Sequence, residues 1–127
     1  MDVLRDEIRA AAEAALADLV GFAARERFDA LEPGRNPFTL FPGARAAVVI
    51  ARRITRGTLR GVEEGVNFGD YGSFGQGWLA GEFLTETLYE TAAALERRGW
   101  EAMPLIPRLR QGVPGVSGPV DPDFSWA

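Results

Sequence analysis

The sequence predicts a small α/β domain in which a short sheet, built around a βαβ unit, is flanked by helices. An apolar, β-branched run at 46–51 has the length and composition of a central strand that is covered on both faces. A helical apolar repeat follows at about 78–98, and a second extended apolar segment lies at 100–105. Strand–helix–strand crossovers almost always join parallel strands in one sheet, so we expect 46–51 and 100–105 to be parallel strands of one sheet.

The first third of the chain carries signals for a helix, a short strand and a loop. Apolar residues at helical spacing predict an amphipathic helix over residues 3–19, and 20–23 then has the pattern of a short strand. Several prolines and glycines interrupt 28–43, which predicts a loop with room for a turn of helix.

The predicted helix at 78–98 has one apolar row that we expect to face the core, formed by Leu84, Leu88, Ala92 and Leu95. Gly99 follows two arginines and is a typical C-terminal stop. Ser73 and Gln76 match a capping box, which would start the helix before residue 78.

The connection at 50–78 is far longer than the usual half-dozen or so residues. It is rich in glycine and arginine and also carries Phe68, Tyr71 and Phe74. Glycine lets the backbone approach a ligand closely, and aromatic rings offer surfaces for stacking. We therefore interpret this segment as a binding loop.

The composition removes several kinds of chemistry. Within 127 residues, lysine, histidine and cysteine are absent, so all 14 basic residues are arginine. No disulfide, cysteine-ligated iron–sulfur cluster, histidine-ligated metal or lysine Schiff base can form from these residues alone. Catalysis would rest on Asp, Glu, Tyr, Ser or Thr, with arginine as the fixed positive charge.

Charge and hydropathy bear on partners and location. A net charge of −4 argues against a general nucleic-acid binder, whose affinity comes mainly from neutralised phosphates. The sequence shows no leader pattern and no apolar run of about 18 residues, so we expect no signal peptide, no membrane span and a cytoplasmic location.

Four segments carry a pattern that is more specific than composition. They are Leu40-Phe-Pro-Gly-Ala-Arg-Ala-Ala-Val-Val-Ile50, Arg53-Ile-Thr-Arg-Gly-Thr-Leu-Arg-Gly-Val-Glu-Glu-Gly65, Tyr71-Gly72 and Leu95-Glu-Arg-Arg-Gly-Trp-Glu-Ala-Met-Pro-Leu105. Their order and spacing, over about residues 15–126, resemble the N-terminal half of epoxyqueuosine-reductase-like iron–sulfur proteins, which are relatives of the corrinoid reductive dehalogenases.

That resemblance implies a cytoplasmic reductase with an N-terminal α/β domain similar to the nitroreductase-like corrinoid-binding fold. In the family a ferredoxin-like module with two 4Fe–4S clusters follows, and a corrinoid such as cobalamin is a candidate cofactor. This chain contains none of the cluster cysteines and stops where the family continues into an Ala-Gly-Leu-Gly helix. We therefore expect 1–127 to be a single, incomplete N-terminal domain with an irregular tail at 104–127, inactive as a reductase on its own.

The resemblance also suggests catalytic residues. The phenol of Tyr71, in a glycine-rich segment, could donate a proton or a hydrogen bond to a bound ligand, as a tyrosine does in reductive dehalogenases; alternatively its ring packs this segment onto the domain. Asp121 and Asp123 lie near the place where epoxyqueuosine reductases carry an acidic proton donor. The alternative for both aspartates is a solvated turn beside Pro122.

Arginines in the long connection form the predicted cofactor-binding set. Guanidinium groups bind phosphate or carboxylate bidentately, so Arg53, Arg56 and Arg60, together with Gly72, are candidates to hold a cofactor or substrate. The alternative is a solvent-exposed face on which neighbouring glutamates pair with these arginines. No metal ligands are predicted within the chain.

The leading interpretation is the N-terminal, cofactor- and substrate-facing portion of an epoxyqueuosine-reductase-like oxidoreductase without its 4Fe–4S module. The alternative is a free-standing, non-catalytic α/β domain for ligand binding or dimerisation. Expected partners are a small molecule or modified nucleoside as substrate, and either a downstream cluster module or a second copy of the chain.

Overall fold

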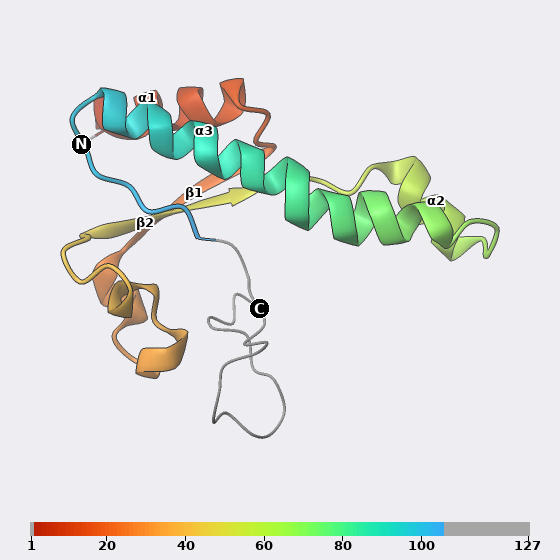
Figure 1. Ribbon diagram of the computed structural model, residues 1–127, viewed down its shortest axis with the longest axis horizontal. Helices are drawn as coiled ribbons and strands as arrows, with labels where there is room; N and C mark the ends of the chain where they lie inside the picture. Colours follow the sequence, from red (N-terminus) through yellow and green to blue (C-terminus); the bar gives the residue numbers. More distant parts are fainter. Residues whose placement is uncertain (1, 106–127) are drawn as a thin grey trace. The chain divides into compact units, whose positions relative to one another are not determined.

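The computed structural model describes residues 2–105, and it confirms the α/β class (Figure 1). Its helices and strands, in chain order, are α1 (Asp2–Ala14), β1 (Leu19–Ala24), β2 (Ala46–Ala51), α2 (Arg56–Glu63) and α3 (Leu84–Arg97). Contacts divide the chain into two compact units. The first contains the residues up to Gly21 together with Val48–Pro104, and Phe22–Ala47 belong to the second.

The two strands pair with each other and run antiparallel. Hydrogen bonds just beyond the pair join the Asp18 N–H to the Ala51 carbonyl at 2.9 Å and the Arg25 N–H to the Arg45 carbonyl at 3.1 Å. β2 has the predicted bounds, but the predicted parallel pairing of 46–51 with 100–105 is wrong.

Residues 100–105 form no strand, so the expected βαβ unit is absent from the described residues. β2 pairs with the strand that precedes it, and Pro104 has no N–H to donate to a ladder. Nor is β2 a central strand covered on both faces, since the side chain of Val49 is 56% exposed.

The β1–β2 connection confirms the prediction of a loop that holds helical turns. It contains three short 3-10 turns, Arg25–Phe28, Pro33–Arg35 and Pro37–Thr39. The guanidinium of Arg25 organises its end by donating to the carbonyls of Pro42 and Ala44 and by lying 5.1 Å from the centre of the Phe38 ring. The loop therefore has internal order without regular secondary structure.

Helix α1 is shorter than the predicted 3–19. It ends in a Schellman motif, in which the Leu16 N–H bonds to Glu13 and the Ala17 N–H to Ala12, both at 2.9 Å. Leu16 takes the left-handed conformation, with φ of 76°, a place usually filled by glycine. The apolar period continues through this point, which is why the sequence predicted a longer helix.

The other two α-helices end in the same way, but with glycine in the left-handed position. Gly65 follows α2 with φ of 71°, and Gly99 follows α3 with φ of 88°, which confirms the predicted stop at Gly99. In each motif the two terminal N–H groups bond back to the last turn at 2.9–3.1 Å.

The long connection at 50–78 is mostly helical, so its prediction as a loop is wrong. After α2 the chain is helical without a break from Gly69 to Arg97. The helix predicted at 78–98 therefore begins well before residue 78. Most of the helix that precedes α3 is π-helix, in the segments Tyr71–Gly77 and Leu79–Phe83. We call Tyr71–Phe83 the widened helix.

The start of this helix is capped by Asn67 and not by the predicted pair Ser73 and Gln76. The Asn67 side-chain oxygen accepts from the Asp70 N–H at 3.1 Å, and its amide donates to the Asp70 carboxylate at 2.7 Å. Such a reciprocal pair satisfies a helix N-terminus, and it offsets the low helix propensity of the glycines that follow.

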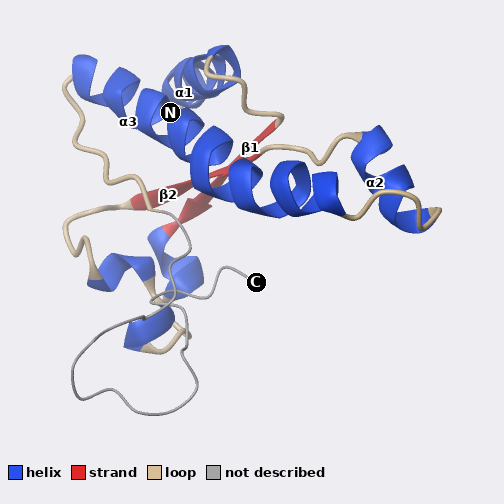
Figure 2. Cartoon of the chain, turned by 45° about the vertical axis from the view of Figure 1, so that its right-hand side comes forward, coloured by secondary structure: helices blue, strands red, loops and turns tan. Residues whose placement is uncertain are grey.

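Helices α1 and α3 lie side by side and enclose the small core of the first unit (Figures 1 and 2). On α3 the buried face carries Thr87, Thr91 and Ala94, whereas the predicted row that contains Leu88 is only half-buried. The threonines tolerate burial because their hydroxyls are bonded: Thr91 donates to the Thr87 carbonyl at 2.7 Å, and Thr87 to that of Ala15 at 2.8 Å.

Candidate functional site

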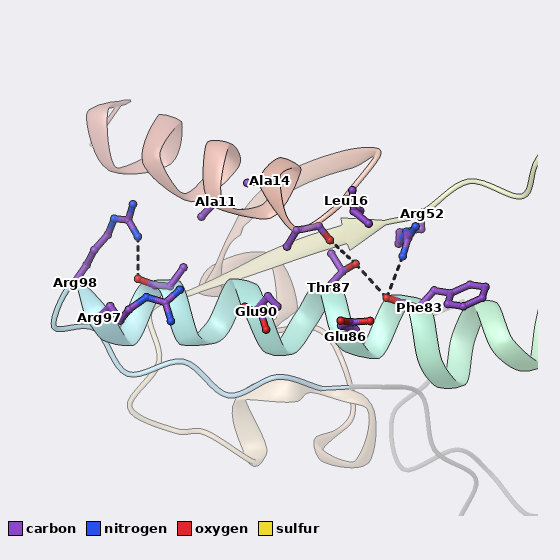
Figure 3. A pocket seen from close by; sticks show the side chains of 12 residues that line it. Ala11, Ala14, Leu16, Arg52, Phe83, Glu86, Thr87, Glu90, Arg97 and Arg98 are labelled. Carbon is purple, nitrogen blue, oxygen red and sulfur yellow. Dashed lines mark hydrogen bonds between the residues drawn. The ribbon is translucent and has the colours of Figure 1, made fainter.

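A cleft of about 560 Å³ runs between α1 and α3 (Figure 3). Its lining residues are Ala11, Ala14, Ala15, Leu16, Arg52, Phe83, Glu86, Thr87, Glu90, Ala94, Arg97 and Arg98. Figure 3 places Arg97 and Arg98 at one end, Arg52 and Phe83 at the other, and Glu86 and Glu90 between them. Cations at both ends with carboxylates between them suit a ligand of mixed charge better than a simple anion.

The Arg98 side chain binds groups of the protein itself at the C-terminal end of α3. Its guanidinium donates to the Ala94 carbonyl at 2.9 Å and lies 3.5 Å from the Glu7 carboxylate. A cation in the last turn stabilises the carbonyl end of a helix, so this arginine has a structural role.

Arg52 is the cation that the sequence interpretation left out of the binding set. It directly follows β2, donates to the Phe83 carbonyl at 3.3 Å and lies 5.8 Å from the centre of the Phe83 ring. It also borders a second cleft of about 400 Å³, which is lined by Glu13, Leu16, Ala17, Asp18, Arg52, Arg53 and Thr55. Successive side chains of an extended chain point to opposite sides, so Arg52 and Arg53, which follow β2, should face different ways. This alternation could have identified Arg52 as a second candidate.

Arg53 faces Asp18 in that second cleft. Its backbone N–H donates to an Asp18 carboxylate oxygen at 2.8 Å, and its Nε lies 3.9 Å from the other. The arginine side chain is 78% exposed, so the ion pair is a weak one in water.

Arg56 and Arg60 lie on α2 and pair with the glutamates at its C-terminal end. Arg56 forms a bidentate pair with Glu63, at 2.9 and 2.7 Å, and Arg60 lies 3.8 Å from Glu64. The hydrogen bonds from Arg56 hold the pKa of the Glu63 carboxyl below its ordinary value. The expected alternative, arginines paired with neighbouring glutamates, is the arrangement observed.

Tyr71 and Gly72 begin the widened helix. The ring of Tyr71 lies against Gly75, one turn further along, where a methyl group would come within 2.5 Å of the ring Cδ2. Gly72 has open space on the side where a side chain would stand. Asp121 and Asp123, the other predicted catalytic residues, lie outside the described residues.

An aromatic row continues along the widened helix. Phe74 meets Trp78 edge-on, with ring centres 5.3 Å apart, and stacks on Phe83 at 6.5 Å. The Arg52 guanidinium lies over the Phe83 ring, at the end of the row, 5.8 Å from its centre. Phe74 is 43% exposed and Trp78 48% exposed, so two of the three rings present apolar surface to solvent.

The structure therefore brings the predicted residues together only in part. Arg56 and Arg60 share one helix, Arg53 lies at the second cleft, and Tyr71 stands on the widened helix. Within residues 2–105, no three acidic side chains gather into a group that could hold a metal ion, and none of the helices is long and apolar enough to cross a membrane.

Comparisons with models of known protein families, with curated proteins and with solved structures found no match. The resemblance to epoxyqueuosine-reductase-like proteins, and to the nitroreductase-like fold, therefore stays a prediction from the motifs.

Proposed function

We propose that this chain is the N-terminal, substrate-facing part of an iron–sulfur oxidoreductase of the epoxyqueuosine-reductase-like kind. The clusters would be supplied from outside these 127 residues, which have no cysteine to hold them. The observation that carries the proposal is the widened helix, which combines Tyr71 with exposed aromatic rings. π-Helical turns are rare and are frequently found at functional sites.

The size of the core supports a role as part of a larger assembly. Among the described residues the largest fully buried side chain is Thr87, whereas Phe68 is 64% and Trp78 48% exposed. Exposed aromatic surface of this kind commonly marks a surface that another protein or a ligand covers. A cluster-bearing module seated near the widened helix would cover it.

Tyr71 is the residue that we assign to proton transfer. For an epoxide substrate, deoxygenation to the alkene consumes two electrons and two protons and releases one water molecule. The Tyr71 O–H gives one proton to the departing oxygen, and solvent supplies the second proton and restores the phenol. Reduced 4Fe–4S clusters, held outside these residues, would supply the two electrons.

The residues predicted to bind a corrinoid do not form a cradle for it. Arg53, Arg56 and Arg60 each face a carboxylate, and of these only Arg53 borders one of the clefts. A corrinoid would supply a cobalt centre for reduction, but no step of the proposal runs through it.

Corrinoid binding stays a prediction that titration of cobalamin onto the chain tests. If the arginines hold an anionic part of it, the double variant Arg53→Ala/Arg56→Ala weakens binding, and the loss shrinks at high salt. Arg35→Ala is the matched control, because Arg35 lies in the β1–β2 connection. Binding that ignores both arginines would remove them from any cofactor site.

Turnover tests the proposal most directly. The chain is combined with a cluster-bearing module, and reduction of an epoxide-bearing nucleoside is followed with dithionite as electron source. Tyr71→Phe lowers kcat about 100-fold or more if the phenol is the acid. Tyr89→Phe, at the other tyrosine of the chain, keeps wild-type turnover. Equal activity of both variants would remove Tyr71 from the mechanism.

The exposed aromatic row also supports the second candidate, a non-catalytic domain that dimerises. In that case light scattering after gel filtration gives the mass of two chains, and Trp78→Asp returns it to one. A monomer that gains activity with a cluster module argues against this candidate.

A further inference from the structure

The contact between Tyr71 and Gly75 differs from every other glycine contact in the described residues. A methyl carbon at Gly75 would lie 2.5 Å from Cδ2, 2.7 Å from Cε2 and 3.2 Å from Cγ of the Tyr71 ring. Carbon atoms in van der Waals contact stay about 3.5–4.0 Å apart. The tyrosine ring therefore occupies the volume that any side chain at position 75 would fill.

Other glycines of the same helix have no such neighbour. A methyl group at Gly72 or Gly81 would meet no atom within 4 Å, and one at Gly77 would meet only the Gly72 carbonyl oxygen, at 3.1 Å. Helix propensity favours alanine over glycine by about 1 kcal/mol at each such position. Gly75 is thus the position in this helix at which the absence of a side chain makes room for a tyrosine ring.

The wide helix and the glycine act together. The four-residue step from Tyr71 to Gly75 spans one turn within the π-helical segment Tyr71–Gly77. Side chains one turn apart lie above each other, so a ring at position 71 falls on position 75. With only hydrogen as the side chain there, the Tyr71 ring occupies the volume that a Cβ atom would take.

We propose that Gly75 is a positioning residue for the Tyr71 phenol. It acts by holding the ring against the helix backbone, so that the hydroxyl is presented in one direction to a bound substrate. This inference rests on the proposed function of Tyr71 as proton donor, but the seat of the ring can be measured without any turnover.

The seat is tested by NMR on the full 127-residue chain. Only two tyrosines are present, so the variant Tyr89→Phe assigns the ring signals of Tyr71. We expect nuclear Overhauser contacts between the Tyr71 ring protons and the α-protons of Gly75. In Gly75→Ala the ring signals shift, whereas in Gly81→Ala they keep their positions. Absent contacts in the wild type, or unshifted ring signals in Gly75→Ala, would overturn the proposal.

Thermal unfolding separates positioning from folding. All three close atoms belong to the Tyr71 side chain, which can swing away, so Gly75→Ala should unfold no more easily than the wild type. A lower melting temperature for Gly75→Ala than for the wild type would make Gly75 a structural glycine and overturn the positioning role.

Turnover with the cluster module then measures the positioning role. We expect Gly75→Ala to lower kcat about 10- to 100-fold with little change in KM, because a proton donor about 1 Å out of place loses about that much. Adding Gly75→Ala to Tyr71→Phe should cost nothing further, since the phenol is already gone. A displaced ring with unchanged kcat overturns the positioning role. If Tyr71→Phe alone keeps full activity, the proposed function fails while the ring seat remains measurable by NMR.

Discussion

Among residues 2–105, Leu16 is the only residue other than glycine with a positive φ. It occupies the left-handed position after α1 that glycine occupies after α2 and α3, and its side chain is 65% exposed. Leu16→Gly should therefore raise the free energy of unfolding by about 1 kcal/mol, by relief of the strain that a Cβ atom causes there. Urea denaturation measures it.

Leu16→Ala is the control, because alanine keeps the Cβ atom and should gain much less. If the two variants had equal stability, the effect would come from the lost leucine packing and not from the backbone. The turn at Leu16 could not be predicted from the sequence, because leucine continues the apolar period of α1. The corresponding turns after α2 and α3 carry Gly65 and Gly99, which are typical of a helix end.

The pair of Arg56 and Glu63 makes a prediction about pH. Because the folded-state pKa of Glu63 is lowered, the pair stabilises the fold above the ordinary carboxyl pKa, and this contribution is lost as pH falls through the lowered value. Arg56→Ala should move the Glu63 titration upward toward its ordinary range, as followed by carboxyl ¹³C NMR. Arg60→Ala, which removes the partner of Glu64, should leave the Glu63 midpoint in place.

At the scale of elements, one hydroxyl makes a hydrogen bond between the end of α1 and α3. Thr87 is 1% exposed and donates across to the Ala15 carbonyl, whereas Thr91 donates only within its own helix. Thr87→Val should cost about 1–3 kcal/mol of unfolding free energy, because it leaves the Ala15 carbonyl without this donor. Thr91→Val should cost clearly less. Similar losses in the two denaturation midpoints would contradict the role of the Thr87 bond between the helices.

The start of the widened helix makes a second prediction at this scale. Asn67→Ala should lower the unfolding free energy by about 1 kcal/mol and reduce helical circular dichroism, since it removes the cap. Ser73→Ala should lower neither, because residue 73 lies inside the helix, where alanine is a better helix former than serine. The reverse ranking would restore the capping box predicted from the sequence.

Element identity was easier to predict than element pairing. The apolar run gave the bounds of β2, because β-branched residues flanked by turn signals leave few alternatives. Its partner could not be predicted, because β1 is short and its pairing depends on the loop that Arg25 organises. The helix between Gly69 and Trp78 was missed because its glycines lower helix propensity, while its cap and the Tyr71–Gly75 contact emerge only in three dimensions.

For the whole molecule, the absence of cysteine gives the plainest prediction. The purified chain should be colourless and should retain no stoichiometric iron after anaerobic preparation, because four-iron clusters need thiolate ligands. Iron analysis and visible absorbance measure it. Stoichiometric iron would contradict the assignment of the chain to the cluster-free part of a reductase.

The candidate site was predictable in its parts but not in its arrangement. Sequence proximity offered the pairing of Arg56 and Arg60 with the glutamates that follow them only as the alternative to cofactor binding, and the structure shows these pairs. It could not show that Arg52 turns toward Phe83, a residue 31 positions away, or that the clefts involve Arg52 and not the arginines of α2.

The packing of α1 against α3 also has a consequence for synthesis on the ribosome. The Ala15 carbonyl and the Thr87 hydroxyl that join the two helices are 72 positions apart. At about 5–20 residues per second, α1 is made roughly 4–14 s before its partner arrives. During that interval the face with Ile8 and Ala12, buried in the finished fold, has no α3 to cover it. The nascent chain should therefore be most open to chaperone capture, and to association with other nascent chains, until α3 has emerged.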